Sequence, residues 1–408
     1  MEPNSTAIIV GGSHSAAQLA PSLRQEGWQG RILIISDESF LPYHRPPLSK
    51  AYLTGEKDPE SLLIRAAAFY EKANIEFMLD TRVDKIDRSA KLVTLSTGES
   101  LAYDKLALCT GSRVRKLPIN GTELKGVHYL RNIADGNAIK ADIKKEGMAV
   151  IIGGGYIGLE TAALLRKTGM QVTVLETMDR VLKRVTAPEV GAFYTRVHNE
   201  EGVVIKTGVI ASKIIGAERA EAVVCNTGAQ VDTDLVIVGI GIIPNTELAS
   251  DAGLKIDNGI LVNEFAETDD PNIVAAGDCT NHPNQLLGRN IRLESVPNAS
   301  EQAKSAAVSM CGNKKVYSTL PWFWSDQFDL KLQIAGLNQG YDQVIIRGDI
   351  NGSRSFVAWY LKEGQLIAAD CVNRVKEFMI AKQALAGLKT IDTTKLADES
   401  VEPKELFI

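Results

Sequence analysis

The sequence has little of what marks several large classes of protein. Its 408 residues include five cysteines, and no two are spaced as a Cys-x-x-Cys pair, a zinc site or a disulfide framework. No stretch reaches the ~18 consecutive apolar residues of a membrane-spanning helix, and the N-terminus lacks the pattern of a signal peptide. A net charge of −5 argues against nucleic acid as a partner. We therefore expect a cytoplasmic protein with reduced thiols, no metal site, and no nucleic-acid or membrane partner.

What the chain does have is length, apolar residues and glycine. A chain of 408 residues exceeds one compact core, so two or three domains are expected. Residues 7–36 and 148–176 both have the pattern strand, glycine turn, helix, strand, which predicts a duplicated nucleotide-binding architecture. From residue 321 the pattern changes to four antiparallel strands and a helix at 375–386. The polar tail after residue 388 is expected to be poorly ordered.

The second of these units contains a complete Gly-x-Gly-x-x-Gly motif at residues 153–158. Its first glycine allows a tight turn, its second admits a pyrophosphate, and its third packs the helix on the strand. The N-terminus of the helix then faces the phosphates. Glu176 ends the next strand, where a carboxylate can bind ribose hydroxyls. The following Thr177 is not basic, although Arg184 is near, so the pattern predicts a dinucleotide site and favours NADH over NADPH.

The first turn, at residues 11–16, matches the motif less well. Ser13 stands where the second glycine is expected. Asp37 and Glu38 follow the next strand, where a ribose-binding acid is expected. From these residues alone two interpretations stay open, a nucleotide site with one altered position and an ordinary strand-to-helix turn.

Five stretches together resemble the NADH-dependent ferredoxin reductases of ring-hydroxylating dioxygenase and cytochrome P450 systems, which are relatives of rubredoxin reductases and apoptosis-inducing factor. They are LPYHRPPLSK at 41–50, CTG at 109–111, GGGYIGLE at 153–160, AGD at 276–278 and PWFWSD at 321–326. The resemblance covers essentially the whole chain. No dithiol motif lies near the first helix, which separates the chain from glutathione- and thioredoxin-reductase types.

The resemblance implies an α/β fold with two Rossmann-like dinucleotide-binding domains, as in glutathione reductase, and a C-terminal α+β domain. The implied FAD-binding domain is discontinuous, at 1–111 and 245–320. The NADH-binding domain would span 112–244, and the C-terminal domain 321–408. The implied activity is FAD-dependent transfer of electrons from NADH to a [2Fe–2S] ferredoxin that feeds an oxygenase.

Most of the site residues are assigned by this resemblance. The implied FAD-binding residues are Gly11, Gly12, Ser13, His14, Ser15, Ala16, Asp37, Glu38, Arg45, Lys50, Val83, Thr110, Gly111, Arg131, Gly277, Asp278, Ser295, Val296 and Trp324. The implied NADH-binding residues are Gly153, Gly155, Tyr156, Ile157, Gly158, Glu160, Glu176, Thr177, Arg184 and Gly239.

Lys50 and Glu160 receive the catalytic role. The resemblance implies that they form an ion pair beside flavin N5, where a lysine stabilises the anionic reduced flavin. Taken as residues alone, Lys50 is equally a solvated surface lysine and Glu160 an acid at a helix start. Trp322 is expected in the core. No catalytic histidine is expected, since hydride transfer to a flavin needs no general base.

The implied ferredoxin is typically acidic, so a locally basic docking surface is expected. The candidates are Arg289, Arg292, Lys304, Lys314, Lys315, Arg374 and Lys376, each of which is also explicable as a solvating surface charge. Two other functions stay open, a rubredoxin reductase and an NADH-responsive flavoprotein that acts by binding. The acidic net charge counts against the second. No motif indicates an oligomeric state.

Overall fold

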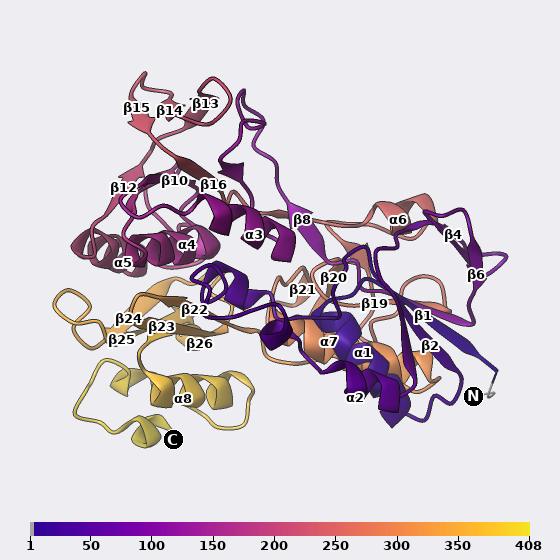
Figure 1. Ribbon diagram of the computed structural model, residues 1–408. Coiled ribbons are helices and arrows are strands. Elements are labelled where there is room, and N and C mark those ends of the chain that lie inside the picture. Colours follow the sequence, from indigo (N-terminus) through magenta and orange to yellow (C-terminus); the bar gives the residue numbers. More distant parts are fainter. Residues whose placement is uncertain (1–3) are drawn as a thin grey trace. The chain divides into compact units, whose positions relative to one another are not determined.

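The computed structural model describes residues 4–408, which form two compact units (Figure 1). The first unit contains the chain up to His44, Pro59–Arg113 and Ile242–Pro321. The second contains Arg45–Asp58, Val114–Gly241 and Trp322–Ile408. The three domain boundaries implied by the resemblance stay a prediction. Among the helices within residues 4–408, none has the length and apolar character that crossing a membrane requires.

The first unit is built on a parallel five-stranded sheet in the order β19-β7-β1-β2-β3. The central strand β1 (Thr6–Val10) pairs with β2 (Arg31–Ile35) and with β7 (Lys105–Leu108). Both faces of β1 are buried, as its unbroken apolar run predicts for a covered parallel sheet. Helices α1 (His14–Gln25) and α7 (Val296–Met310) pack against each other over one apolar core of this unit.

The other elements of the first unit complete this sheet and its surroundings. They are η2 (Glu60–Leu62), α2 (Ala67–Lys72), β3 (Ile75–Met78), β4 (Val83–Asp87), β5 (Leu92–Leu95), β6 (Ser100–Ala102), β8 (Ser112–Val114), β17 (Ile242–Pro244), α6 (Glu247–Asp251), β18 (Ile260–Leu261), β19 (Ile273–Ala275), β20 (Thr280–Asn284) and β21 (Arg289–Ile291). β8 and β17 carry the chain between the two units.

The second unit repeats the arrangement. Its parallel sheet has the order β12-β11-β10-β16-β9, and β10 (Met148–Ile152) takes the central place that β1 has in the first unit. β10 pairs with β11 (Gln171–Glu176) and leads into α4 (Tyr156–Lys167). The other elements of this segment are η1 (Pro46–Ser49), β9 (Val127–His128), α3 (Ile133–Asp142), α5 (Pro188–Glu200), β12 (Val203–Thr207), β13 (Ala211–Ile215), β14 (Ala222–Cys225), β15 (Gln230–Asp232) and β16 (Leu235–Val238).

The second unit also holds an antiparallel sheet in the order β22-β23-β26-β25-β24. Its strands are β22 (Trp322–Gln327), β23 (Leu330–Gly336), β24 (Gln343–Arg347), β25 (Phe356–Lys362) and β26 (Gln365–Val372). Within this unit α8 (Val375–Leu385) packs on β23 and β26, and α4 packs on β22 (Figure 1). The four expected strands are confirmed, whereas β22 was not expected.

The expectation of a poorly ordered tail after residue 388 is wrong. The tail forms η3 (Thr393–Lys395) and η4 (Pro403–Leu406), and Leu396 and Leu406 are fully buried. The buried Arg347 donates hydrogen bonds to the main-chain carbonyls of Asp398 and Val401. Burial of Leu396 and Leu406 and the hydrogen bonds of Arg347 therefore order a segment whose overall composition is polar.

Candidate dinucleotide sites and a buried ion pair

The turn between β10 and α4 has the geometry that its glycine motif predicts. Gly153 has a φ of +113°, and a Cβ added there would lie 2.4 Å from the carbonyl oxygen of Gly239. A Cβ on Gly158 would lie 2.1 Å from the carbonyl oxygen of Gly153. At Gly155, by contrast, no atom of residues 4–408 outside Gly155 and its two chain neighbours lies within 4 Å of the added Cβ. The protein itself thus requires two of the glycines, and at the third it leaves open space where the motif places a pyrophosphate.

Glu176 is held at the carboxyl end of β11. Its Oε2 accepts a hydrogen bond from the Gly154 N–H at 2.7 Å, and its Oε1 accepts one from the Met178 N–H, also at 2.7 Å. Each carboxylate oxygen has a further lone pair for a ribose hydroxyl. The neighbouring Thr177 and Arg184 are exposed. Gly155, the cap of α4, has no side chain, so the first N–H groups of the helix are free to face phosphate. The residues present therefore fit a dinucleotide.

The turn between β1 and α1 follows the same path with different residues. Gly11 has a φ of +105°, and a Cβ there would lie 2.2 Å from the carbonyl oxygen of Cys109. A Cβ on Gly12 would lie 2.5 Å from Ser36 Oγ. Ser13 is extended, with φ −123° and ψ −156°, and its side chain makes no capping hydrogen bond to α1 within residues 4–408. This helix N-terminus is therefore also open to phosphate, which fits FAD.

Several predicted FAD ligands lie together in the first unit. Gly277 has a φ of +94°, and a Cβ there would lie 2.4 Å from Ser15 Oγ, so the 276–278 turn closely approaches the start of α1. Ser112 Oγ donates to Asp278 at 3.0 Å. Thr110 exchanges hydrogen bonds with Asn245, which fixes the turn that holds Gly111. The geometry thus brings the AGD turn and the glycine turn to one place.

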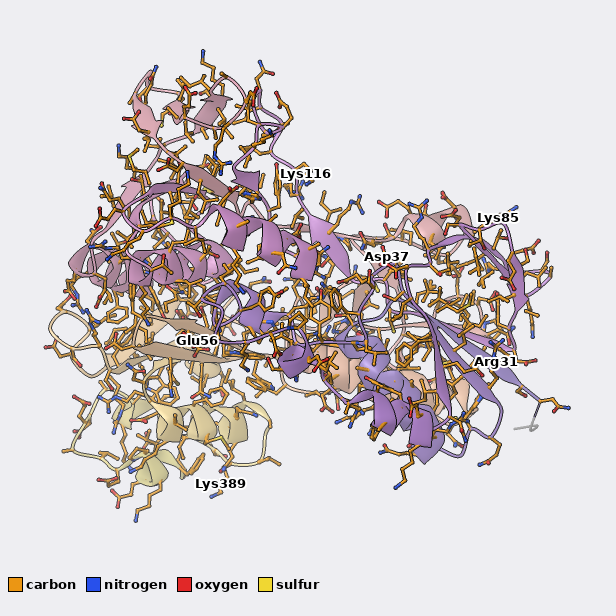
Figure 2. The ribbon with its side chains drawn as sticks, viewed as in Figure 1. Arg31, Asp37, Glu56, Lys85, Lys116 and Lys389 are labelled. Carbon is orange, nitrogen blue, oxygen red and sulfur yellow. The ribbon has the colours of Figure 1, made fainter. Side chains whose placement is uncertain are left out.

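The acids predicted to bind the FAD ribose differ in their surroundings. Asp37, labelled in Figure 2, is exposed. Glu38 is half-buried and accepts a short hydrogen bond from the hydroxyl of Tyr43. The local structure therefore orients Glu38 more firmly than Asp37 for a ribose hydroxyl.

The remaining predicted FAD residues are placed as follows. Val83 starts β4 and packs in an apolar core. Ser295 caps α7 by accepting the Asn298 N–H, and Val296 is its first residue. Arg45, Lys50, Arg131 and Trp324 belong to the second unit, where Arg45 donates to the Arg131 carbonyl oxygen at 2.8 Å. Their contacts with FAD stay predictions.

Lys50 and Glu160 form the ion pair that the resemblance implies. Lys50 Nζ lies 3.4 Å from Glu160 Oε1 and 2.8 Å from Asp326 Oδ2, and the lysine side chain is 22% exposed. The Glu160 side chain is 8% exposed, whereas that of Asp326 is 47% exposed. Lys50 therefore pairs with two carboxylates, the buried one of Glu160 and the exposed one of Asp326. Neither of the plain alternatives, a solvated lysine and a helix-start acid, describes these side chains.

Glu160 is surrounded by hydrogen-bond donors. Ser49 Oγ donates to its Oε2 at 2.8 Å, and Ser325 Oγ donates to its Oε1 at 2.7 Å. The N–H of Asp326 adds a weaker bond at 3.3 Å. Burial raises the pKa of the Glu160 carboxyl, while the charge of Lys50 and the bonds from Ser325 and Ser49 oppose that rise. These donors favour the anionic carboxylate in a place where burial disfavours it.

Sequence reasoning missed Ser49, Ser325 and Asp326 as members of this cluster. Ser49 ends η1 directly before Lys50, and the other two follow Trp324 on β22. Side chains alternate along a strand, so Ser325 and Gln327 share a face of β22 and are both buried, whereas Asp326 is exposed. All three residues lie in the two quoted motifs, at residues 41–50 and 321–326. The motifs alone did not indicate which side chains contact one another. Trp322, as expected, packs on an apolar core.

Comparisons with known proteins identify the family to which the chain belongs. Residues 5–303 match the family model described as pyridine nucleotide-disulphide oxidoreductase, and residues 322–407 match the reductase C-terminal model. The chain is 43% identical to putidaredoxin reductase from Pseudomonas putida, over 100% of this chain and 98% of that protein. It is 42% identical to a ferredoxin–NAD(P)(+) reductase from a Sphingomonas species, over 94% of each. A crystal structure of the covalent putidaredoxin reductase–putidaredoxin complex matches with a TM-score of 0.96 and 43% identity, covering 99% of this chain and 98% of that chain.

Proposed function

Since the chain belongs to the pyridine nucleotide-disulphide oxidoreductase family, we propose that it is an FAD-dependent ferredoxin reductase. It takes electrons from NADH and passes them to a [2Fe–2S] ferredoxin that serves an oxygenase. The observation that carries the proposal is the pair of open glycine turns, one in each unit, because two dinucleotides need two such turns. Similarity to a ferredoxin–NAD(P)(+) reductase over 94% of the chain supports the choice of a ferredoxin as the acceptor.

The two turns divide the cofactors between them. The turn at 153–158, with Glu176, suits NADH, because its carboxylate accepts from ribose hydroxyls and would repel a 2′-phosphate. The turn at 11–16, with Glu38 and the 276–278 turn, is left for FAD. FAD held at this turn would supply the redox chemistry that links a two-electron donor to a one-electron acceptor.

The chain's own residues supply binding, charge and geometry. Lys50 holds a positive charge that is only partly exposed, and Glu160 keeps it from turning wholly toward solvent. We assign these two residues to the reaction centre as the resemblance implies. No proton transfer by a histidine is needed, so the role of the site is electrostatic.

The predicted docking cations are not equally available. Arg292, Lys304, Lys314 and Arg374 each pair with a carboxylate of this chain. Lys315 and Lys376 are exposed, and among residues 4–408 no salt bridge engages either of them. We propose that these two contribute most to attraction of an acidic ferredoxin.

We also place the protein in the cytoplasm, as its five cysteines, none of them in a disulfide, indicate.

The test is NADH-driven reduction of purified acceptors by the FAD-loaded protein. A panel of [2Fe–2S] ferredoxins and rubredoxins is compared at equal concentration, with NADPH in place of NADH as the donor control. We expect faster turnover with a ferredoxin and a strong preference for NADH. Faster reduction of rubredoxins would make the protein a rubredoxin reductase. A long-lived complex of NADH with the flavin and no turnover would indicate a binding role.

A further inference from the structure

A row of hydrogen bonds leads from Glu160 into the interior of the second unit. Ser325 Oγ, which donates to Glu160, accepts a hydrogen bond from Gln327 Nε2 at 3.1 Å. Gln327 Oε1 lies 2.8 Å from Nε2 of His198. Ser325 and Gln327 are each 1% exposed, and His198 is fully buried. These hydrogen bonds join β22 to α5. The proposed reaction assigns no role to Gln327 or His198.

The hydrogen bonds of this row have a direction. Because Gln327 Oε1 faces His198, its NH₂ group faces Ser325, and the serine proton is left for Glu160. His198 maintains this orientation if its Nε2 carries the proton. Its Nδ1 is buried, without a hydrogen-bond partner within residues 4–408. Because the Gln327 amide oxygen can only accept, a hydrogen bond to it requires the proton on Nε2, which leaves Nδ1 unprotonated in the neutral ring. Burial also lowers the pKa of His198, so the ring is neutral.

We propose that His198 and Gln327 are positioning residues for the Lys50–Glu160 ion pair, acting through Ser325. This inference rests on the proposed function, which places the ion pair at the reaction centre. A reversed Gln327 amide would present its oxygen to Ser325, and the hydroxyl would then donate to the amide instead of to Glu160. Glu160 would lose a donor, which raises the pKa of its carboxyl and favours the neutral acid, and Lys50 would then have Asp326, 2.8 Å away, as its charged partner. The N–H of His198 prevents that reversal.

The charged and titratable groups around this row are few. Lys50 and Asp326 face Glu160 at one end. At the other end the charge of Glu201 opposes the lowering of the His198 pKa by burial, and the charges of Asp370, Glu160 and Asp326 act on Tyr194 of α5. Burial raises the pKa of Tyr194 far above its ordinary value, so it stays neutral. A change in Glu160 titration can therefore be traced to this small set.

The test compares His198→Leu with His198→Gln in the FAD-loaded protein. Leucine removes the N–H, whereas glutamine can place an amide N–H near the former Nε2. The first readout is the infrared titration of the Glu160 carboxyl, assigned by the loss of its band in Glu160→Gln. We expect His198→Leu to raise the pKa of Glu160 by roughly half a unit or more, because a weakened donor favours the protonated acid. His198→Gln is expected to titrate like the unmodified protein.

The second readout is the limiting rate of flavin reduction at saturating NADH, measured with the dissociation constant of NAD⁺. We expect His198→Leu to lower the rate roughly fivefold, the effect of about one weakened hydrogen bond, with the dissociation constant unchanged. His198→Gln should restore the rate. A His198→Leu protein with normal titration and rate would overturn the proposal, as would equal defects in both variants.

A second position keeps the proposal testable if His198→Leu does not fold. Gln327→Met keeps the volume but removes the amide, and we expect the same upward shift in Glu160 titration. Gln365→Met, at an exposed position on β26, is the matched control and should change nothing. Normal Glu160 titration in Gln327→Met would contradict the proposal. Failure of the proposed function would appear instead as no ferredoxin reduction by the unmodified protein, which leaves the infrared result independent.

Discussion

One difference between the two glycine turns lies at the third residue of each turn, where the second turn leaves room for a Cβ. Gly11 and Gly153 have nearly the same φ, +105° and +113°, and a Cβ at either would collide with a carbonyl oxygen of a neighbouring strand end. At the third position the first turn has Ser13 and the second has Gly155. Apart from Gly155 and its two chain neighbours, no atom of residues 4–408 lies within 4 Å of a Cβ added at Gly155, so the described protein leaves room for a Cβ where the motif places a pyrophosphate. The motif at residues 11–16 therefore keeps the positive-φ glycine at its first position, whereas Ala16 stands where the second turn has Gly158.

The acids that follow the two turns differ as well. β1 and β2 pair Val10 with Ile35, and β10 and β11 pair Ile152 with Leu175. By this register Ser36 occupies the place of Glu176. The acids predicted for the first unit come one and two residues later, as Asp37 and Glu38, and the Tyr43 hydroxyl donates a hydrogen bond to Glu38. The spacing between glycine and acid is thus not fixed by the sheet, because the loop after the strand can carry the acid.

The largest expected effect comes from alanine at the first glycine of each turn. Gly153→Ala forces a side chain into a positive φ and toward Gly239, at a cost of about 2–4 kcal/mol. We expect NADH binding to be lost and FAD to be retained, with the reverse in Gly11→Ala. Bound FAD is measured by absorbance, NADH binding by titration, and stability by urea unfolding. Loss of both cofactors in both variants would show that the turns are not independent.

A smaller effect is expected from the acids. Glu176→Ala should weaken NADH binding roughly tenfold, because a charged acceptor for the ribose is removed, and should relax the preference against NADPH. Ser36→Ala, the matched change in the first unit, should leave FAD binding nearly unaffected. Binding is measured by titration with NAD⁺ and NADP⁺. Equal losses in the two variants would contradict the register argument.

Gly155→Ser would convert the second turn into the form of the first. Because the protein leaves open space there, the free energy of unfolding should change by no more than about 0.5 kcal/mol. The dissociation constant of NAD⁺ should rise, yet by less than about tenfold, if the serine takes the extended conformation of Ser13. Urea unfolding of the ligand-free protein measures the change in stability separately from the change in affinity for NAD⁺. A strongly destabilised ligand-free protein would mean that the turn itself requires this glycine.

The smallest effect is expected for Ser13→Gly, which removes the difference. FAD should stay bound, and the free energy of unfolding should fall by only about 0.3 kcal/mol, because glycine is tolerated at the N-cap position that Ser13 occupies. FAD content after gel filtration is the measurement. Loss of FAD would show that the serine hydroxyl, and not the turn, holds the cofactor.

Much of the fold was predictable because its signals are local. The two strand–turn–helix units, the antiparallel strands and the last helix all follow from patterns within about 15 residues. The tail after residue 388 was not predictable in this way, since its order depends on Arg347, which is more than 50 residues away in the chain. β22 was missed because its sequence, WFWSDQ, has no clear alternation until its buried and exposed positions are known.

The sequence by itself determined where two dinucleotide turns form, because positive-φ glycines and strand-end acids act over a few residues. It also pointed to Lys50 and Glu160 through family motifs. Only the tertiary structure decided what surrounds that pair. Ser49, His198, Ser325 and Gln327 come from three separate segments, and Lys50 and its partner Asp326 are 276 residues apart in the chain. Packing of α4 against η1 and β22 brings Ser49 and Ser325 to one carboxylate, and no local pattern encodes this contact.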